Sequence, residues 1–99
     1  MALVNYKLNG VTANTLTNVA SVAAGQRLMV TGIKIFNKST TINAKVTIRM
    51  AGMEIWEDTI TPRESIFMDG QADVIGSLEK IEIKSDNADI SVLVSGDLA

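Results

Sequence analysis

The sequence predicts an all-β protein, an antiparallel β-sandwich of about eight short strands, because three features recur along it. Apolar and polar residues alternate with a period of two, which is typical of half-buried antiparallel strands. Turn-forming residues separate these segments, and helical spacing is scarce. The alternation assigns three inward apolar faces: Val46, Ile48 and Met50; Ile81 and Ile83; and Ile90, Val92 and Val94.

The first four expected strands occupy residues 3–8, 15–22, 27–36 and 43–50. Residues 1–10 are either an edge strand or an N-terminal arm that pairs with a neighbouring subunit, because chain termini are often loose unless docked. Asn9-Gly10 is the strongest short hairpin signal in the chain. Gly32 interrupts the strand at 27–36, and a glycine in that position often marks a bulge or a close approach of another backbone.

The last four expected strands occupy residues 53–60, 64–68, 78–84 and 89–95. Ala51-Gly52 forms the turn before the first of them, because Gly52 tolerates the positive φ that such a turn needs. Pro62 separates the first strand from the second, since proline cannot donate to a central ladder. Asp69-Gly70 closes the strand at 64–68, and residues 85–88 form the loop between the last two strands.

The length of 99 residues suits a single domain, 1–99, with one hydrophobic core. Many short strands separated by turns fit a sandwich or a small barrel, and we expect a sandwich. Apolar residues make up 46% of the chain, which is high for so small a domain. The excess lies either in a core rich in valine and isoleucine or on an interface.

Charge is divided sharply between the two halves of the chain. Residues 1–50 hold six basic residues and no acid, whereas residues 51–99 hold all eleven acids and three basic residues. If the halves interleave in one sheet, opposite charges pair across strands. If they form different faces, the dipolar molecule suits head-to-tail contact in a ring or lattice. We favour cross-strand pairing.

The composition argues against an enzyme and against a bound cofactor or metal. The chain has no histidine to activate its hydroxyl groups and no cysteine for a thiolate, a metal or a disulfide. Glu54 and Asp58 share one face of a strand and Glu57 faces away, which favours a solvated edge over a catalytic carboxylate pair. The acidic segments 69–73 and 86–89 are ordinary turn formers and lack the spacing of a calcium loop.

Nucleic acid and membrane partners are not expected. The net charge is −2 and aromatic residues make up only 4% of the chain, so platforms for base stacking are few. No apolar run approaches the roughly 20 residues of a membrane-spanning helix. The first four residues are followed at once by the polar Asn5 and Lys7, which does not fit a signal peptide. We therefore expect synthesis in the cytoplasm.

One pattern covers residues 21–97: a corner at Val22-Ala23-Ala24-Gly25, a long strand ending at Asn37, and an alternating strand from Ala44 to Met50. Gly76-Ser77-Leu78 then precedes Ile81-Glu82-Ile83. This pattern resembles small virion proteins of tailed bacteriophages, namely capsid decoration or cement proteins and head–tail or tail components. The resemblance implies a jelly-roll-like sandwich, made in the host cytoplasm and located in the virion. It also implies an assembly role and supplies no catalytic residues.

The function expected from the resemblance is therefore capsid decoration, by self-association and by binding to a shell. The expected partners are other copies, in a trimer or larger ring, and a major capsid or tail protein. Trp56 faces outward if Met53 and Ile55 face the core, and an exposed tryptophan is a typical interface anchor. The predicted contact residues are Trp56, Leu3, Val4 and Tyr6.

Three other functions remain open. One is a component of a phage tail or of a head–tail connector ring, which also works by assembly. A small carbohydrate-binding β-sandwich module uses an exposed aromatic residue such as Trp56 as a stacking platform. A small regulatory or inhibitor domain requires a specific soluble partner.

Overall fold

The computed structural model describes residues 2–99, and at residues 69–73 it describes the backbone alone. The described residues form eight β-strands, which confirms the predicted all-β class and strand number. The strands are β1 (Ala2–Asn9), β2 (Thr17–Ser21), β3 (Leu28–Asn37), β4 (Ala44–Met50), β5 (Met53–Ile60), β6 (Ser65–Ile75), β7 (Lys80–Ser85) and β8 (Ile90–Leu98). No helix in this part of the chain is long and apolar enough to span a membrane.

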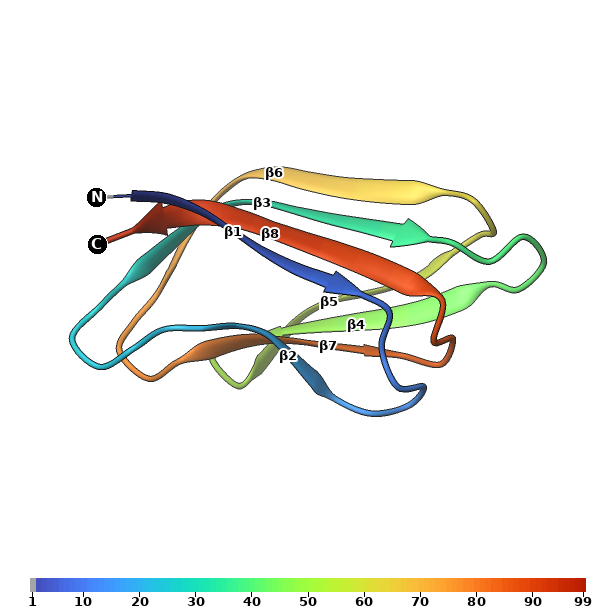
Figure 1. Cartoon of the computed structure of the whole chain (residues 1–99), viewed down its shortest axis with the longest axis horizontal. Helices are drawn as coiled ribbons and strands as arrows, with labels where there is room; N and C mark the ends of the chain where they lie inside the picture. Colours follow the sequence, from blue (N-terminus) through green and yellow to red (C-terminus); the bar gives the residue numbers. More distant parts are fainter. Residues whose placement is uncertain (1) are drawn as a thin grey trace.

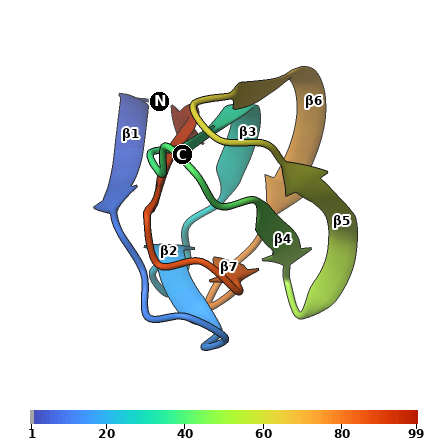
Figure 2. The ribbon, with the colours of Figure 1, turned by 90° about the vertical axis from the view of Figure 1, so that its right-hand side faces the viewer.

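The strands form two four-stranded sheets that pack face to face (Figures 1 and 2). One sheet has the order β1-β8-β3-β6, and the other has the order β2-β7-β4-β5. The antiparallel pairs β1–β8, β2–β7, β3–β6 and β4–β5 fold the chain back on itself like one long hairpin. This is the connectivity of a jelly roll, so the sandwich expected from the sequence is confirmed.

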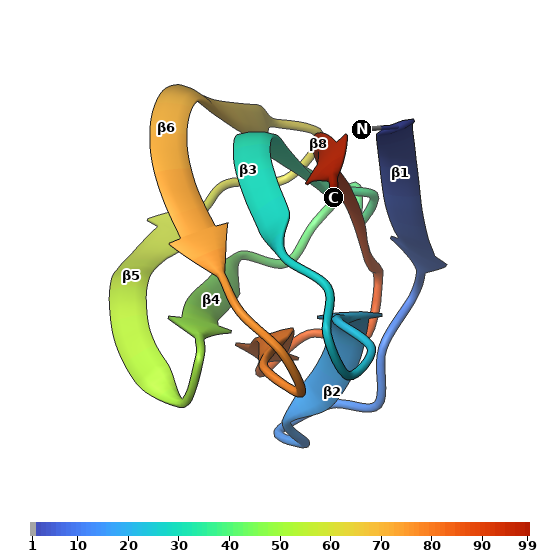
Figure 3. The same ribbon diagram turned by 90° about the vertical axis from the view of Figure 1, so that its left-hand side faces the viewer.

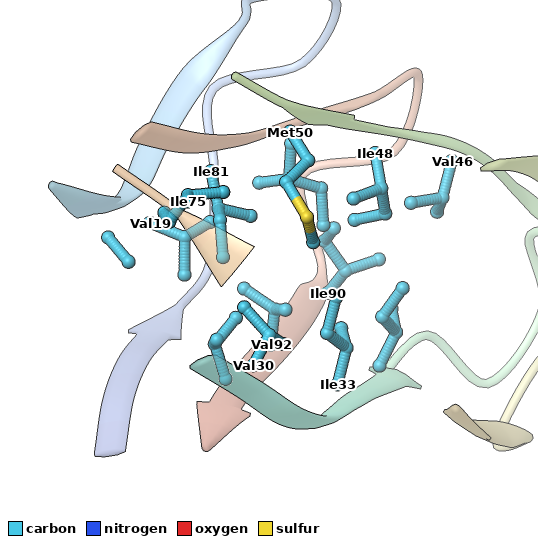
Figure 4. Packing of buried hydrophobic residues seen from close by; sticks show 14 of the residues in the cluster. Val19, Val30, Ile33, Val46, Ile48, Met50, Ile75, Ile81, Ile90 and Val92 are labelled. Atoms are coloured by element: carbon cyan, nitrogen blue, oxygen red, sulfur yellow. The ribbon is translucent and has the colours of Figure 1, made fainter. Parts of the chain in front are cut away.

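The hydrophobic core lies between the two sheets. In Figure 4, Val46, Ile48 and Met50 of β4 point toward Val30 and Ile33 of β3 across this space. Fully burying one such side chain stabilises the fold by roughly 1.5–3 kcal/mol. The three inward faces assigned from the sequence are all buried, which confirms the alternation of β4, β7 and β8.

A bulge in β3 brings the backbones of β3 and β8 very close together. The register shifts between Val30 and Gly32 against both neighbouring strands, which confirms the bulge predicted at Gly32. Gly96 of β8 lies opposite Val30. A Cβ atom at Gly96 would lie 2.6 Å from the carbonyl oxygen of Met29 and 2.8 Å from a methyl group of Leu28. Only glycine therefore fits this position without a shift of the backbone.

The turn signals had different outcomes. Ala51 and Gly52 have φ values of 54° and 77°, as the two-residue hairpin between β4 and β5 requires. Asn9-Gly10 does not form the predicted hairpin, because β1 pairs with β8 and the chain then crosses to the other sheet. The predicted end of β6 at Asp69-Gly70 is also wrong, because the strand continues to Ile75. Pairing across the sheet overrides both local signals.

A buried amide organises the end of the sandwich that lies away from the termini. The side chain of Asn37 is fully buried. Its amide nitrogen donates to the carbonyl oxygens of Ile42 and Ile60 at 2.9 and 3.0 Å. Its oxygen accepts from the Ser39 backbone at 3.0 Å and from the Asn87 side chain at 3.4 Å. All four hydrogen-bonding positions of this amide are thus used.

The close approach at Gly96 gives the first testable prediction. We expect Gly96→Ala to lower the free energy of unfolding by about 1–3 kcal/mol, because the new methyl group meets the fixed carbonyl of Met29. Urea unfolding followed by far-UV circular dichroism measures the loss. Gly32→Ala is the control, since its nearest atom is the exposed ring tip of Phe67 at 3.3 Å, which can move. A Gly96→Ala variant as stable as the control would contradict the packing.

Candidate functional site

Six of the eight large apolar side chains that are exposed in the described structure come from the first residues of β1, β3 and β5, the end of β6 and the β6–β7 loop, which all lie toward the side of the sandwich that holds both chain termini (Figure 1). We call them the terminal cluster: Leu3, Met29, Met53, Ile55, Val74 and Leu78. Leu3 and Leu78 are 84% and 76% exposed, respectively. The strand register and a hollow link five of these residues, and Leu78 stands in the loop between β6 and β7. Large apolar groups that are contiguous on a surface mark a contact site more often than scattered ones do.

The strand register places half of this cluster in one row. Met29 of β3 lies opposite Val74 of β6 on one side and Asp97 of β8 on the other, and Asp97 lies opposite Leu3 of β1. Residues that pair directly share one face of a sheet. Leu3, Met29 and Val74 therefore cross the outer face of the β1-β8-β3-β6 sheet, and Asp97 is the only polar member of the row.

The cluster continues around the side of the sandwich where β5 and β6 lie next to each other (Figure 3). A hollow of about 370 Å³ lies there, and its lining includes Met53, Ile55 and Val74. Both flanking strands are at the edge of their sheets. An apolar hollow beside two edge strands offers side-chain contacts together with backbone groups that can pair with another chain.

The predicted contact residues of the N-terminal segment divide into two kinds. Residues 2–9 pair with β8 along their whole length, so this segment is an edge strand of its own sheet. Leu3 points outward into the terminal cluster. Val4 and Tyr6 are half-buried and pack against the core. Of these three residues, only Leu3 presents most of its side chain at the surface.

The predicted outward orientation of Trp56 is wrong. Trp56 is half-buried and packs against the core, whereas Met53 and Ile55, which were expected to face inward, are 69% and 42% exposed. The cause is a register shift between β4 and β5. Ile48 pairs with Trp56 and Arg49 pairs with Glu54, so Ile55 is an extra residue that reverses the alternation.

The outer face of the β2-β7-β4-β5 sheet is polar, and basic residues of β4 stand beside acidic residues of β5 and β7. Arg49 of β4 lies between Glu54 of β5 and Glu82 of β7. Lys45 Nζ lies 3.4 Å from a carboxylate oxygen of Glu57. On this sheet the basic first half of the chain therefore meets the acidic second half strand by strand, as the favoured interpretation of the charge division expects.

The same bulge brings Glu54 and Glu57 onto one face, where the sequence predicted opposite faces. A hydrogen bond with Glu54, the charge of Lys45 and a hydrogen bond with Lys45 lower the pKa of Glu57. Thr47 Oγ1 also donates to Glu57 at 3.3 Å. The ion pair of Glu57 with Lys45 is exposed and is therefore of the kind that contributes little to stability.

The acidic loops do not assemble a metal site in the part of the chain whose side chains are described. Asp86 Oδ1 accepts a hydrogen bond from the Lys45 backbone at 2.9 Å. Asn87 Oδ1 accepts one from the Asp89 backbone, also at 2.9 Å. These side chains stabilise the loop between β7 and β8. The side chains of the other acidic segment, 69–73, lie outside the described structure.

Comparisons with known proteins identify no relative. No protein family model matches the sequence, and no curated protein matches it either. The function is therefore argued from the geometry of this chain together with the resemblance noted above.

Sequence reasoning found one member of the terminal cluster and missed the other five. Met29 could have been found, because it alternates with the inward-facing Leu28 and Val30. The sequence predicted that Met53 and Ile55 face the core, because no residue of β5 indicates the bulge. Val74 was missed because the predicted strand ended at residue 68, whereas β6 continues to Ile75. Finding the cluster required the pairing of strands that are distant in the sequence.

The burial of Trp56 gives the second testable prediction. We expect Trp56→Ala to lower the free energy of unfolding by about 2 kcal/mol or more, since the indole packs against the core. Thr59→Ala, at an exposed position of the same strand, should change it by less than about 0.5 kcal/mol. Chemical denaturation of both variants measures the difference. Equal losses in the two variants would show that Trp56 does not belong to the core.

Proposed function

We propose that this chain is a non-enzymatic structural protein of a virion that acts by self-association and by binding to a larger shell. Capsid decoration is the first role, and a tail or head–tail ring is the second. The observation that supports the proposal is the terminal cluster. A domain that works alone in water gains nothing from gathering six large apolar side chains at one end, whereas an assembly buries them.

The position of the cluster favours contact between copies. It extends from the face of one sheet to the side of the sandwich, so a partner touches both the row of Leu3, Met29 and Val74 and the hollow beside β5. Obligate interfaces are apolar at their centre, like a domain core cut in half. The expected assembly is a trimer or larger ring that then binds a major capsid or tail protein.

The charge division contributes less to this contact than the sequence suggested. On the β2-β7-β4-β5 sheet Lys45 already forms an ion pair with Glu57, and Arg49 stands in register with Glu54 and Glu82, so these charges have acidic neighbours within the chain. Exposed charge contacts are screened by salt, whereas apolar contacts are not. An assembly held by the terminal cluster should therefore persist at high salt.

The fold is compatible with the proposal without deciding it. Jelly rolls form viral capsid domains, and they also form lectin domains and cupins. The alternative function, carbohydrate binding, loses its expected platform because Trp56 packs against the core. The observation that still favours it is the presence of Phe36 and Phe67 on the outer face of the β1-β8-β3-β6 sheet.

The mass of the protein in solution tests self-association. Light scattering on a sizing column, at low and high salt, should give a defined multiple of 10.6 kDa under both conditions. Each leucine buried in a contact contributes roughly 1.5–3 kcal/mol. Leu3→Ser/Leu78→Ser should therefore weaken the association constant by about a hundredfold or more and give monomers.

Ile42→Ser is the matched control, because Ile42 is 59% exposed but lies in the loop between β3 and β4 at the opposite end. It should leave the mass unchanged. A wild-type monomer at every concentration and salt tested would contradict self-association, and binding to purified capsids would then test the shell contact by itself. An assembly that dissociates in high salt would attribute the contact to charges in place of the cluster.

A further inference from the structure

A second hollow, of about 640 Å³, lies on the outer face of the β1-β8-β3-β6 sheet, toward the end away from the termini. Two adjacent rows of paired residues line it. The first row is Lys7, Leu93 and Lys34, and the second is Asn9, Ser91, Phe36 and Ser65. The volume falls within the range of small-ligand sites, about 300–1,000 Å³.

The charge of this hollow is positive. Lys7 and Lys34 are exposed on either side of Leu93, two strand spacings apart, so their Cα atoms are separated by about 9–10 Å. The salt bridges within the described part of the chain involve Lys45 and Lys80, and neither lysine of the hollow. No carboxylate is among the lining residues whose side chains the structure describes. An anionic group is the natural complement to two such ammonium groups.

Two further cations stand beside the hollow. Lys38 Nζ donates to Asn9 Oδ1 at 3.0 Å, which leaves the amide nitrogen of Asn9 as a donor. The Arg63 guanidinium lies 6.0 Å from the centre of the Phe36 ring. Arg63 has a φ of 64°, which is unfavourable for a residue with a Cβ atom. Its backbone nitrogen donates to the carbonyl oxygens of Asn37 and Ser39, and these bonds hold it there.

The remaining groups fit a sugar ring. Sugars present hydroxyl groups around the ring and C–H groups on its faces. Ser65, Ser91 and Asn9 supply small polar partners for hydroxyl groups. Phe36 and Leu93 supply an apolar surface beside them. Specific ligand sites combine such apolar walls with a few polar groups that fix orientation.

Other anionic occupants fit less well. An extended peptide recognises strand edges through backbone hydrogen bonds. The edge strands β1 and β6 contribute Lys7, Asn9 and Ser65 to the lining, but the middle of both rows lies on β8 and β3, which are paired on both sides. Single-stranded nucleic acid needs a basic groove with successive aromatic platforms. The lining offers two lysines and one aromatic ring. A short ligand with one acidic group and several hydroxyl groups matches the lining better.

We propose that this hollow binds an acidic sugar, with its carboxylate or sulfate group at Lys7 and Lys34 and its ring against Phe36 and Leu93. The site is separate from the terminal cluster and does not depend on self-association. It gives the sandwich a second surface, which recognises a saccharide while the apolar end contacts protein.

An array of immobilised oligosaccharides tests the proposal with the full chain. The array holds uronate-, sialate- and sulfate-bearing oligosaccharides beside neutral ones, together with a polyglutamate peptide and single-stranded oligothymidylate. We expect retention on acidic oligosaccharides and none on the neutral ones. Amide chemical shifts, followed by NMR during titration with the best oligosaccharide, should change around residues 7–9, 34–36 and 91–93.

Matched variants locate the binding. Lys7→Gln/Lys34→Gln should weaken binding to the best oligosaccharide by at least about tenfold, because two charge-assisted contacts are lost. Lys84→Gln, on the outer face of the other sheet, should leave it unchanged. All three lysines are exposed, so circular dichroism should show an intact fold. The variant Leu3→Ser/Leu78→Ser should bind the same oligosaccharide whether it is a monomer or an oligomer.

Four results would overturn the proposal. One is no preference for acidic over neutral oligosaccharides. Another is equal binding of inorganic sulfate, which would make the site a simple anion site. Stronger retention on polyglutamate or oligothymidylate would assign the hollow to a peptide or a nucleic acid. Unchanged binding in the Lys7→Gln/Lys34→Gln variant would place the ligand elsewhere.

Discussion

The buried amide of Asn37 is the constraint on which the sandwich depends most. Four connections cross between the two sheets at the end away from the termini. The Asn37 side chain bonds to groups in two of them, the β3–β4 and β7–β8 loops, and to the last residue of β5, after which a third connection begins. An unsatisfied buried polar group costs about 1–3 kcal/mol. Because the amide satisfies these groups, one side chain fixes how the sheets are joined. Its neighbours Phe36 and Lys38 are thereby placed at the hollow that contains Lys7 and Lys34.

The parts of the fold that depend on local pattern could be predicted from the sequence, and the parts that depend on pairing could not. Alternation located β4, β7 and β8, and their buried faces are the expected ones. The same reasoning gave the wrong orientation for Ile55 in β5, because the bulge there depends on the pairing with β4 and cannot be recognised from the residues of β5 alone. The sequence did not mark Asn37 as a buried side chain, because two of its four partners, Ile60 and Asn87, are brought to it only by the fold.

The two outer faces of the sandwich explain why the candidate sites were hard to foresee. On the β2-β7-β4-β5 sheet, neighbouring strands place opposite charges side by side, and this polar outer face is suited to contact with water. On the β1-β8-β3-β6 sheet, Lys7, Lys34 and Leu93 come from three distant parts of the chain and meet in one row. Sequence alone showed each residue as an ordinary member of its own strand. The positive charge of this surface arises only when the three residues are brought into one row.

The pairing of β1 with β8 also governs how the fold is reached. Ala2 lies opposite Leu98, so an edge strand near one end of the chain is completed by a central strand near the other. Non-local pairing of this kind slows folding, because the entropy of closing a long loop must be overcome before the contacts form. On the ribosome, β1 and β3 must wait for β8 to emerge. Until then they present unpaired edges to neighbouring nascent chains, a state prone to aggregation.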